Sequence, residues 1–255
     1  MRTLADPAGA TIVGPPDGPA IVFVHGTRAT RAFWAPQQAR LGDAYRTIAI
    51  DLPGHGTRAG EPFTLDAAAD VVAEVIDREA GGRAVVVGLS LGGYVALALA
   101  ARSPERVHGL VLAGATAEPG GVLRIAFEAF ALALASFSGA AADAVSRWYF
   151  ARRFPPAVAD PILAAGFWPI GGAAAVRAIA RERFLPRMAA YPGPTLFVNG
   201  EWDLPFRLGG RRFARVAADP HRVLIRGATH LSNLERPDAF STAIRRFMIS
   251  LEGTP

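Results

Sequence analysis

A serine between two glycines has the surroundings of a catalytic nucleophile. Ser90 lies where the β-branched run at residues 85–87 gives way to a helical pattern, with Gly88 and Gly92 two residues to either side. A strand-to-helix turn this sharp brings the flanking backbone together, so glycines avoid contacts that any Cβ would worsen. The backbone N–H of Leu91, in the first helical turn, is then placed to face a developing oxyanion. Such a pattern also arises in purely structural turns, so its context has to support the catalytic interpretation.

A neutral serine is a poor nucleophile and needs a base that accepts its proton near neutral pH, which favours histidine. His230 follows the predicted strand 222–225 and therefore lies at the same sheet edge as Ser90. The other histidines precede the serine, occupy turn motifs or lie toward the opposite edge: His25, His55, His108 and His221. A loop histidine is the ordinary alternative for His230 taken alone.

The histidine in turn needs a carboxylate that fixes its tautomer and stabilises the imidazolium. Asp203 and Glu201 both lie in the loop after the predicted strand 195–198. We favour Asp203, because Glu201 directly follows Gly200 and is expected to stay at the strand end. A helix cap is the alternative role for Asp203.

Strands and helices alternate along most of the chain, which predicts parallel pairing through helical crossovers and an α/β three-layer sandwich with a mostly parallel central sheet. Buried strands are predicted at residues 20–24, 45–50, 85–87, 107–113, 195–198 and 222–225. Between Thr116 and Pro192 the alternation stops and several helices follow one another. We therefore expect a core domain formed by residues 1–116 and 192–255, with residues 117–191 inserted as a helical cap.

Composition narrows the functional classes. The 255 residues are 51% hydrophobic and contain no cysteine, which excludes disulfides, thiol nucleophiles and thiolate metal sites. The net charge of +5 comes from arginines scattered among acidic residues, which argues against a nucleic-acid partner. No stretch has the pattern of a membrane span or a signal peptide, so we predict a cytoplasmic protein without a membrane partner. Neither a metal site nor a cofactor is expected, because no carboxylate–histidine cluster or phosphate-binding loop occurs.

The chain resembles α/β-hydrolase-fold enzymes of the serine-nucleophile, cap-bearing, esterase- or lactonase-like kind. The matching motifs cover nearly its whole length and are His25-Gly26, residues 51–56, residues 88–93, residues 200–203, residues 227–230 and residues 233–237. The resemblance implies the order nucleophile, acid, histidine, which Ser90, Asp203 and His230 satisfy, and a second oxyanion donor in the backbone N–H of Thr27. Family members with an aspartate nucleophile act on epoxides or carbon–halogen bonds, and the serine argues against both.

The predicted cap is rich in aromatic residues, most of which we expect to serve packing. A helical lid over a catalytic edge commonly supplies an apolar pocket wall, so Phe130, Trp148 and Phe167 are candidates for substrate binding. Arg152 lies beside Trp148 and is a candidate partner for an acidic substrate group, although a solvated helix arginine is the plainer interpretation.

These features predict a cofactor-independent serine hydrolase that cleaves a carboxylic ester, lactone or thioester with an apolar acyl or alcohol group. The same fold and triad also serve carbon–carbon bond hydrolysis, lyase and perhydrolase chemistry, and slow-turnover receptors for small ligands. The sequence does not indicate an oligomeric state.

Overall fold

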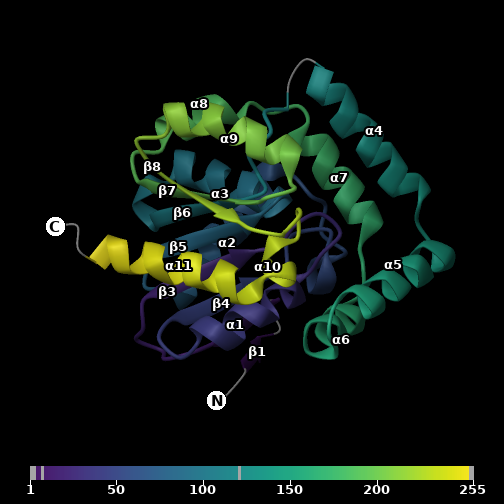
Figure 1. The fold of residues 1–255 in the computed structure, drawn as a ribbon, viewed down its shortest axis with the longest axis horizontal. Coiled ribbons are helices and arrows are strands. Elements are labelled where there is room, and N and C mark those ends of the chain that lie inside the picture. The colour runs from purple at the N-terminus through teal and green to yellow at the C-terminus, as the bar shows by residue number, and fades with distance from the viewer. Residues whose placement is uncertain (1–3, 7–8, 120–121, 253–255) are drawn as a thin grey trace.

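A central eight-stranded sheet organises the protein, which is described here from a computed structural model covering residues 4–6, 9–119 and 122–252 (Figure 1). Its strands are β1 (Leu4–Asp6), β2 (Ala10–Val13), β3 (Ala20–Val24), β4 (Arg46–Ile50), β5 (Ala84–Leu89), β6 (Val107–Ala113), β7 (Pro194–Gly200) and β8 (Asp219–Ile225). They run in the order β1-β2-β4-β3-β5-β6-β7-β8. The pairs from β4 to β8 are parallel, whereas β1 and β2 pair antiparallel at one edge.

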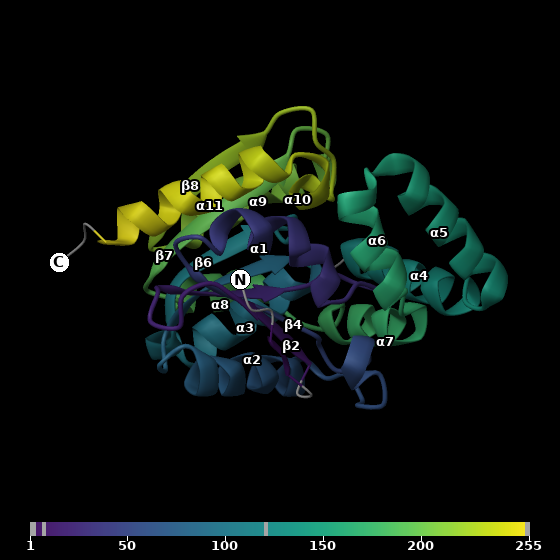
Figure 2. The same cartoon turned by 90° about the horizontal axis from the view of Figure 1, so that it is seen from below.

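Helices cover both faces of this sheet. They are α1 (Ala35–Leu41), α2 (Leu65–Glu79), α3 (Leu91–Arg102), α4 (Val122–Ser136), α5 (Ala140–Arg153), α6 (Pro156–Ala165), α7 (Pro169–Ile179), α8 (Phe184–Ala190), α9 (Leu204–Val216), α10 (Ser232–Glu235) and α11 (Pro237–Glu252). Figure 2 shows α1 and α11 on one side of the sheet and α2, α3 and α8 on the other. Two separate apolar clusters fill these two interfaces, which confirms the three-layer α/β architecture.

Local sequence explains the central elements. Every residue of β5 is buried, as expected for a strand that is covered on both faces. The Thr64 side chain accepts a hydrogen bond from the backbone N–H of Ala67 at 3.0 Å and so caps α2, with Asp66 in the first turn near the positive helix end. The apolar stripe of α2 packs against α3 and the sheet.

The edges of the sheet depart from the sequence-based expectation. Beyond the predicted buried strands, β2 pairs antiparallel with β4, and β1 pairs antiparallel with β2. Strand β8 begins at Asp219 rather than at Arg222, and its first residues are exposed. As the last strand of the sheet, β8 pairs with β7 through its backbone, and this pairing needs no apolar side chains where the start of the strand is exposed.

Among the described residues, five helices lie between β6 and β7. Four of them, α4 to α7, gather beyond one end of the sheet and are called the cap helices here (Figures 1 and 2). Helix α8 lies within the predicted cap range, yet its Phe184 and Met188 pack in the core cluster with α2 and α3. The division into core and cap domains at residues 117–191 stays a prediction.

The cap helices attach to the core through aromatic packing. The rings of Phe33, from the core, and Phe150, from α5, meet edge to face with centroids 5.6 Å apart.

Within the described ranges no single helix has both the length and the apolar composition to cross a membrane, and the sharply bent pairs α4–α5 and α6–α7 meet those criteria only when joined.

Candidate active site

Ser90 occupies a strained turn between β5 and α3. Its backbone has φ +52°, a region that side-chain-bearing residues rarely adopt. The backbone N–H of Ser90 donates to the carbonyl of Ala113 at 2.7 Å, which ties the turn to the neighbouring strand. A Cβ on Gly88 would clash with the backbone of Gly92, and one on Gly92 with the carbonyl of Val24. The predicted role of these two glycines is confirmed, and the tight turn holds the serine hydroxyl at the sheet edge.

An aspartate–histidine pair lies at the same edge. Nδ1 of His230 is 2.9 Å from Oδ2 of Asp203, and the Asp203 side chain is only 6% exposed. Glu201 faces another loop, where its Oε2 accepts a hydrogen bond from the backbone N–H of Gly227 at 2.8 Å. Of the two acids in this loop, Asp203 is therefore the one in contact with the histidine.

Two residues that the sequence did not single out complete the surroundings of this pair. The ring of Phe206, at the start of α9, stacks on the His230 imidazole with centroids 4.8 Å apart. Gly114 has φ +55°, and a Cβ there would lie 2.9 Å from the imidazole and 3.1 Å from Oδ2 of Asp203. Gly114 directly follows β6 at the functional edge, which is the signal that could have identified it.

The remaining histidines have other surroundings. Leu52 N–H donates to Nε2 of His25 at 3.0 Å, so the buried His25 ring carries its proton on Nδ1, next to the carbonyl of Gly26. His55 Nδ1 lies 3.0 Å from the carbonyl of Pro53. His221 pairs with Asp219 inside β8. Among the described residues, no group of three or more histidine or acidic side chains could hold a metal ion.

The predicted oxyanion donors, the N–H groups of Leu91 and Thr27, belong to segments next to Ser90. Helix α3 begins at Leu91, so its N–H belongs to the first turn, where backbone donors lack intrahelical partners. Gly26, just before Thr27, lies beside the nucleophile: a Cβ there would be 3.4 Å from Ser90 Cβ. Tyr94 also borders the site, but its hydroxyl donates to the carbonyl of Ala117 at 2.6 Å, and burial raises its pKa. The Tyr94 hydroxyl proton is therefore engaged in this hydrogen bond rather than available as a general acid, and the residue forms part of the wall of the site.

Ser90 and His230 both line a cavity of about 820 Å³ between the core and the cap helices. Its wall is mostly apolar and includes Phe33, Tyr94, Phe127, Tyr149, Phe150 and Phe206. The predicted substrate-binding residues Phe130, Trp148 and Phe167 line it, as does Thr27. Arg152 does not: its guanidinium lies over the Trp148 ring, 5.5 Å from the centroid. The wall instead contains Arg28, which the sequence did not single out.

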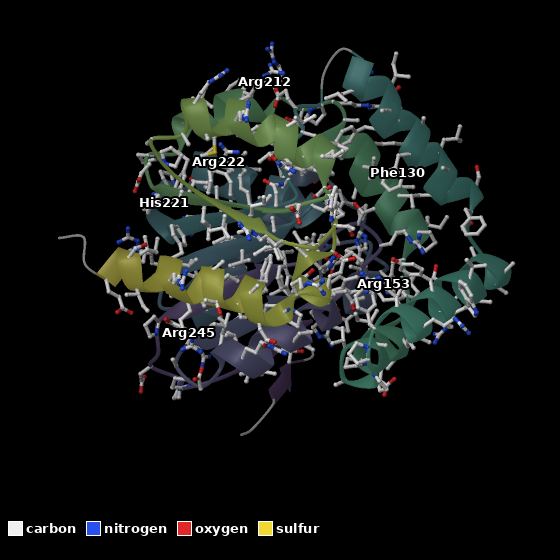
Figure 3. All side chains as sticks on the ribbon, in the orientation of Figure 1. Phe130, Arg153, Arg212, His221, Arg222 and Arg245 are labelled. Carbon is white, nitrogen blue, oxygen red and sulfur yellow. The ribbon has the colours of Figure 1, made fainter. Side chains whose placement is uncertain are left out.

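An acidic residue links the histidine loop to the cap. Glu235, at the end of α10, accepts hydrogen bonds from the backbone N–H and the hydroxyl of Thr229, the residue before His230. The same carboxylate pairs with Arg153 of α5 at 2.9 Å. Figure 3 shows Arg153 between the cap and the core and Phe130 on the cap side.

The strained turn at Ser90 joins a strand to a helix, as in the nucleophile turn of α/β-hydrolase folds. The His230–Asp203 pair follows later strands, and Ser90 and His230 line one cavity. The sequence profile of the Alpha/beta hydrolase family matches residues 21–243, and the chain belongs to this family.

Relatives and solved structures agree with this assignment. The chain is 29% identical over 251 residues to 3-oxoadipate enol-lactonase 1 of Acinetobacter baylyi, covering 94% of this chain and 92% of that protein. It is 43% identical to a pimeloyl-[acyl-carrier protein] methyl ester esterase of Neisseria meningitidis, but over 93 residues, or 36% of this chain and 35% of the relative. The crystal structure of an E-2-(acetamidomethylene)succinate hydrolase superposes with a TM-score of 0.79 at 25% identity, covering 94% of both chains.

Proposed function

We propose that this protein is a cofactor-independent serine hydrolase that cleaves a carboxylic ester, lactone or thioester through an acyl-enzyme. The observation that carries the proposal is that Ser90, on its strained turn, lines the same cavity as His230, which is itself paired with the buried Asp203. The joint placement of nucleophile, base and buried carboxylate supports catalysis more strongly than any one of them alone.

In the proposed reaction, Nε2 of His230 takes the proton of the Ser90 hydroxyl while its oxygen attacks the substrate carbonyl. The buried Asp203 accepts from Nδ1–H, keeps that tautomer and stabilises the imidazolium. The N–H groups of Thr27 and Leu91 stabilise the oxyanion. The imidazolium then gives its proton to the departing alcohol, alkoxide end of the lactone, or thiol. Water, activated by the same histidine, attacks the acyl-enzyme and releases the acid and free Ser90.

The cavity and the relatives support the substrate class. Aromatic and aliphatic side chains form most of a wall large enough for a small molecule, which favours an apolar acyl or alcohol group. One relative is named for an enol-lactone and another for a methyl ester, and both bonds contain the acyl carbon–oxygen linkage that this chemistry breaks.

Steady-state kinetics on para-nitrophenyl acetate, butanoate, hexanoate and octanoate tests the proposal. We expect many turnovers per protein molecule with the wild type, a higher kcat/KM for the medium-length chains than for acetate, and loss of turnover in Ser90→Ala. Tight ester binding with at most one turnover would instead indicate a ligand receptor, and full activity of Ser90→Ala would contradict the mechanism.

A further inference from the structure

We propose that Arg28 binds a carboxylate of the substrate, so that the natural ester, lactone or thioester carries an acidic group on the part that enters the cavity. This inference rests on the proposed hydrolase function and specifies its substrate class. Arg28 directly follows the proposed oxyanion donor Thr27 in the chain and lines the same cavity as Ser90 and His230. Its Cα is therefore about 3.8 Å from that of Thr27.

Arg28 differs in charge from the other residues of the cavity wall. Among the described residues that form the cavity wall, Arg28 is the one with a permanent charge, and neither aspartate nor glutamate is present. The wall is otherwise mostly aromatic and aliphatic. An apolar cavity with a single fixed cation matches a ligand that combines an apolar chain with one anionic group.

The guanidinium lacks a carboxylate partner in the described part of the chain. Its Nη2 donates to the hydroxyl of Ser146 at 2.7 Å, and its Nε is buried without a hydrogen-bond partner. Asp143 borders a smaller cavity together with Arg28 and favours its charged form, but the Asp143 carboxylate accepts a hydrogen bond from Nε of Arg147 at 2.6 Å. Burial lowers the pKa of Arg28, which reflects an incompletely compensated charge. A substrate carboxylate would accept a charge-assisted hydrogen bond from one of the terminal N–H groups of this guanidinium.

The backbone holds this side chain in place at a conformational cost. Arg28 has φ +63°, a left-handed conformation that is unfavourable for a residue with a long side chain. Its carbonyl accepts a hydrogen bond from the N–H of Trp168 at 3.0 Å, and its guanidinium lies 5.7 Å from the Phe167 ring centroid. These contacts with the loop before α7 fix Arg28 at the junction of core and cap.

Arg28 takes no part in making or breaking bonds in this proposal. Its contact with the carboxylate is the same in the bound substrate and in the transition state, so its loss should raise KM far more than it lowers kcat. A change that merely deformed the turn next to Thr27 would lower kcat for every substrate. The two explanations therefore predict different kinetic signatures.

Matched esters separate these outcomes. Mono-para-nitrophenyl adipate and para-nitrophenyl hexanoate have acyl chains of equal carbon number and differ in a terminal carboxylate in place of a methyl group. We expect the wild type to prefer the adipate ester by about tenfold or more in kcat/KM, and Arg28→Gln to lower its kcat/KM by about 10- to 100-fold, mainly through KM. Hexanoate hydrolysis should change less than about threefold in Arg28→Gln.

Arg152→Gln is the matched control, since Arg152 lies outside the cavity wall. The proposal is overturned if the wild type has no preference, if Arg28→Gln affects both esters equally, or if Arg152→Gln removes the preference instead. Calorimetric titration of monomethyl adipate into Ser90→Ala, with and without Arg28→Gln, needs no turnover. Binding weakened at least about tenfold by Arg28→Gln supports the carboxylate site even if ester hydrolysis fails, and unchanged binding overturns it.

Discussion

At the scale of single residues, the contact between Asp203 and His230 is the most informative. A buried carboxylate 2.9 Å from Nδ1 leaves Nε2 free to face the cavity that contains Ser90. This tautomer is the one that can accept a serine proton. The nearby Glu201 cannot substitute for it without leaving the backbone N–H of Gly227.

Replacing Asp203 with asparagine should keep the side-chain shape but favour the wrong imidazole tautomer. We expect kcat for a para-nitrophenyl ester to fall by about 10⁴-fold. The control Glu201→Gln retains an acceptor for Gly227 and should cost less than about tenfold. Steady-state kinetics of both variants checks this, and a larger loss in Glu201→Gln would assign the acid to Glu201.

The sequence predicted Ser90, Asp203 and His230 as a triad because each follows a recognisable strand, and in the structure His230 contacts Asp203 and shares a cavity with Ser90. It did not identify Arg28, Gly114 or Phe206. Their importance depends on distances across the fold, such as the 4.8 Å between the Phe206 and His230 rings, and no local pattern encodes these. Arg28 in particular resembles any other surface arginine until the cap helices are packed over it.

At the scale of helices and strands, the strands buried on both faces could be predicted from the sequence, whereas the extent of the strands at the sheet edges could not. Strands β3 and β6 have the predicted bounds, because their apolar runs are covered on both faces. Strand β1 and the start of β8 lie at sheet edges, where backbone pairing forms without an apolar pattern. The packing of α8 against α3 likewise depends on tertiary contacts.

The cap helices should determine acyl-chain preference. Phe130 of α4 lines the cavity, and Phe130→Ala removes apolar contact for a longer chain but little for acetate. We expect kcat/KM for para-nitrophenyl hexanoate to fall by about 3- to 10-fold, with acetate hydrolysis nearly unchanged.

Leu132→Ala is the matched control for Phe130→Ala, since Leu132 is exposed on the same helix and lies outside the cavity wall. The ratio of kcat/KM for the hexanoate ester to kcat/KM for the acetate ester should be the same in Leu132→Ala as in the wild type. The prediction is contradicted if Phe130→Ala lowers kcat/KM equally for both esters, or if Leu132→Ala changes the ratio as Phe130→Ala does. Either result would show that this face of α4 does not bind the acyl chain.

At the scale of the whole molecule, two buried histidines couple stability to pH. The rings of His25, which follows β3, and His55, in the loop after β4, have centroids 5.0 Å apart. Burial, and next the neighbouring His25, lowers the pKa of His55 to about 3. Burial also lowers the pKa of His25. Both rings therefore stay neutral in the folded protein at pH values where the unfolded chain is already protonated.

The sign of the effect follows from this difference. Below the ordinary histidine pKa of about 6.5, the unfolded state binds more protons, so the free energy of unfolding decreases as the pH falls from there toward about 3. His55 alone should account for a loss of about 2 kcal/mol between pH 7 and pH 5.

Urea unfolding of the wild type and His55→Asn at pH 7 and pH 5 measures this contribution. The variant should be less stable at pH 7, because a buried ring is lost, but its stability should decrease less between the two pH values. Equal decreases in both proteins would show that His55 is protonated in the folded state.

The central claim is that Ser90 is the nucleophile, and labelling with a fluorophosphonate tests it most directly. This reagent forms a stable phosphonyl adduct with a serine that an adjacent base activates. Mass spectrometry of the digested protein should find one adduct, on the peptide that contains Ser90. Asp203→Asn should slow its formation and Ser90→Ala should abolish it. An adduct on another serine, or undiminished labelling of Ser90→Ala, would contradict the account.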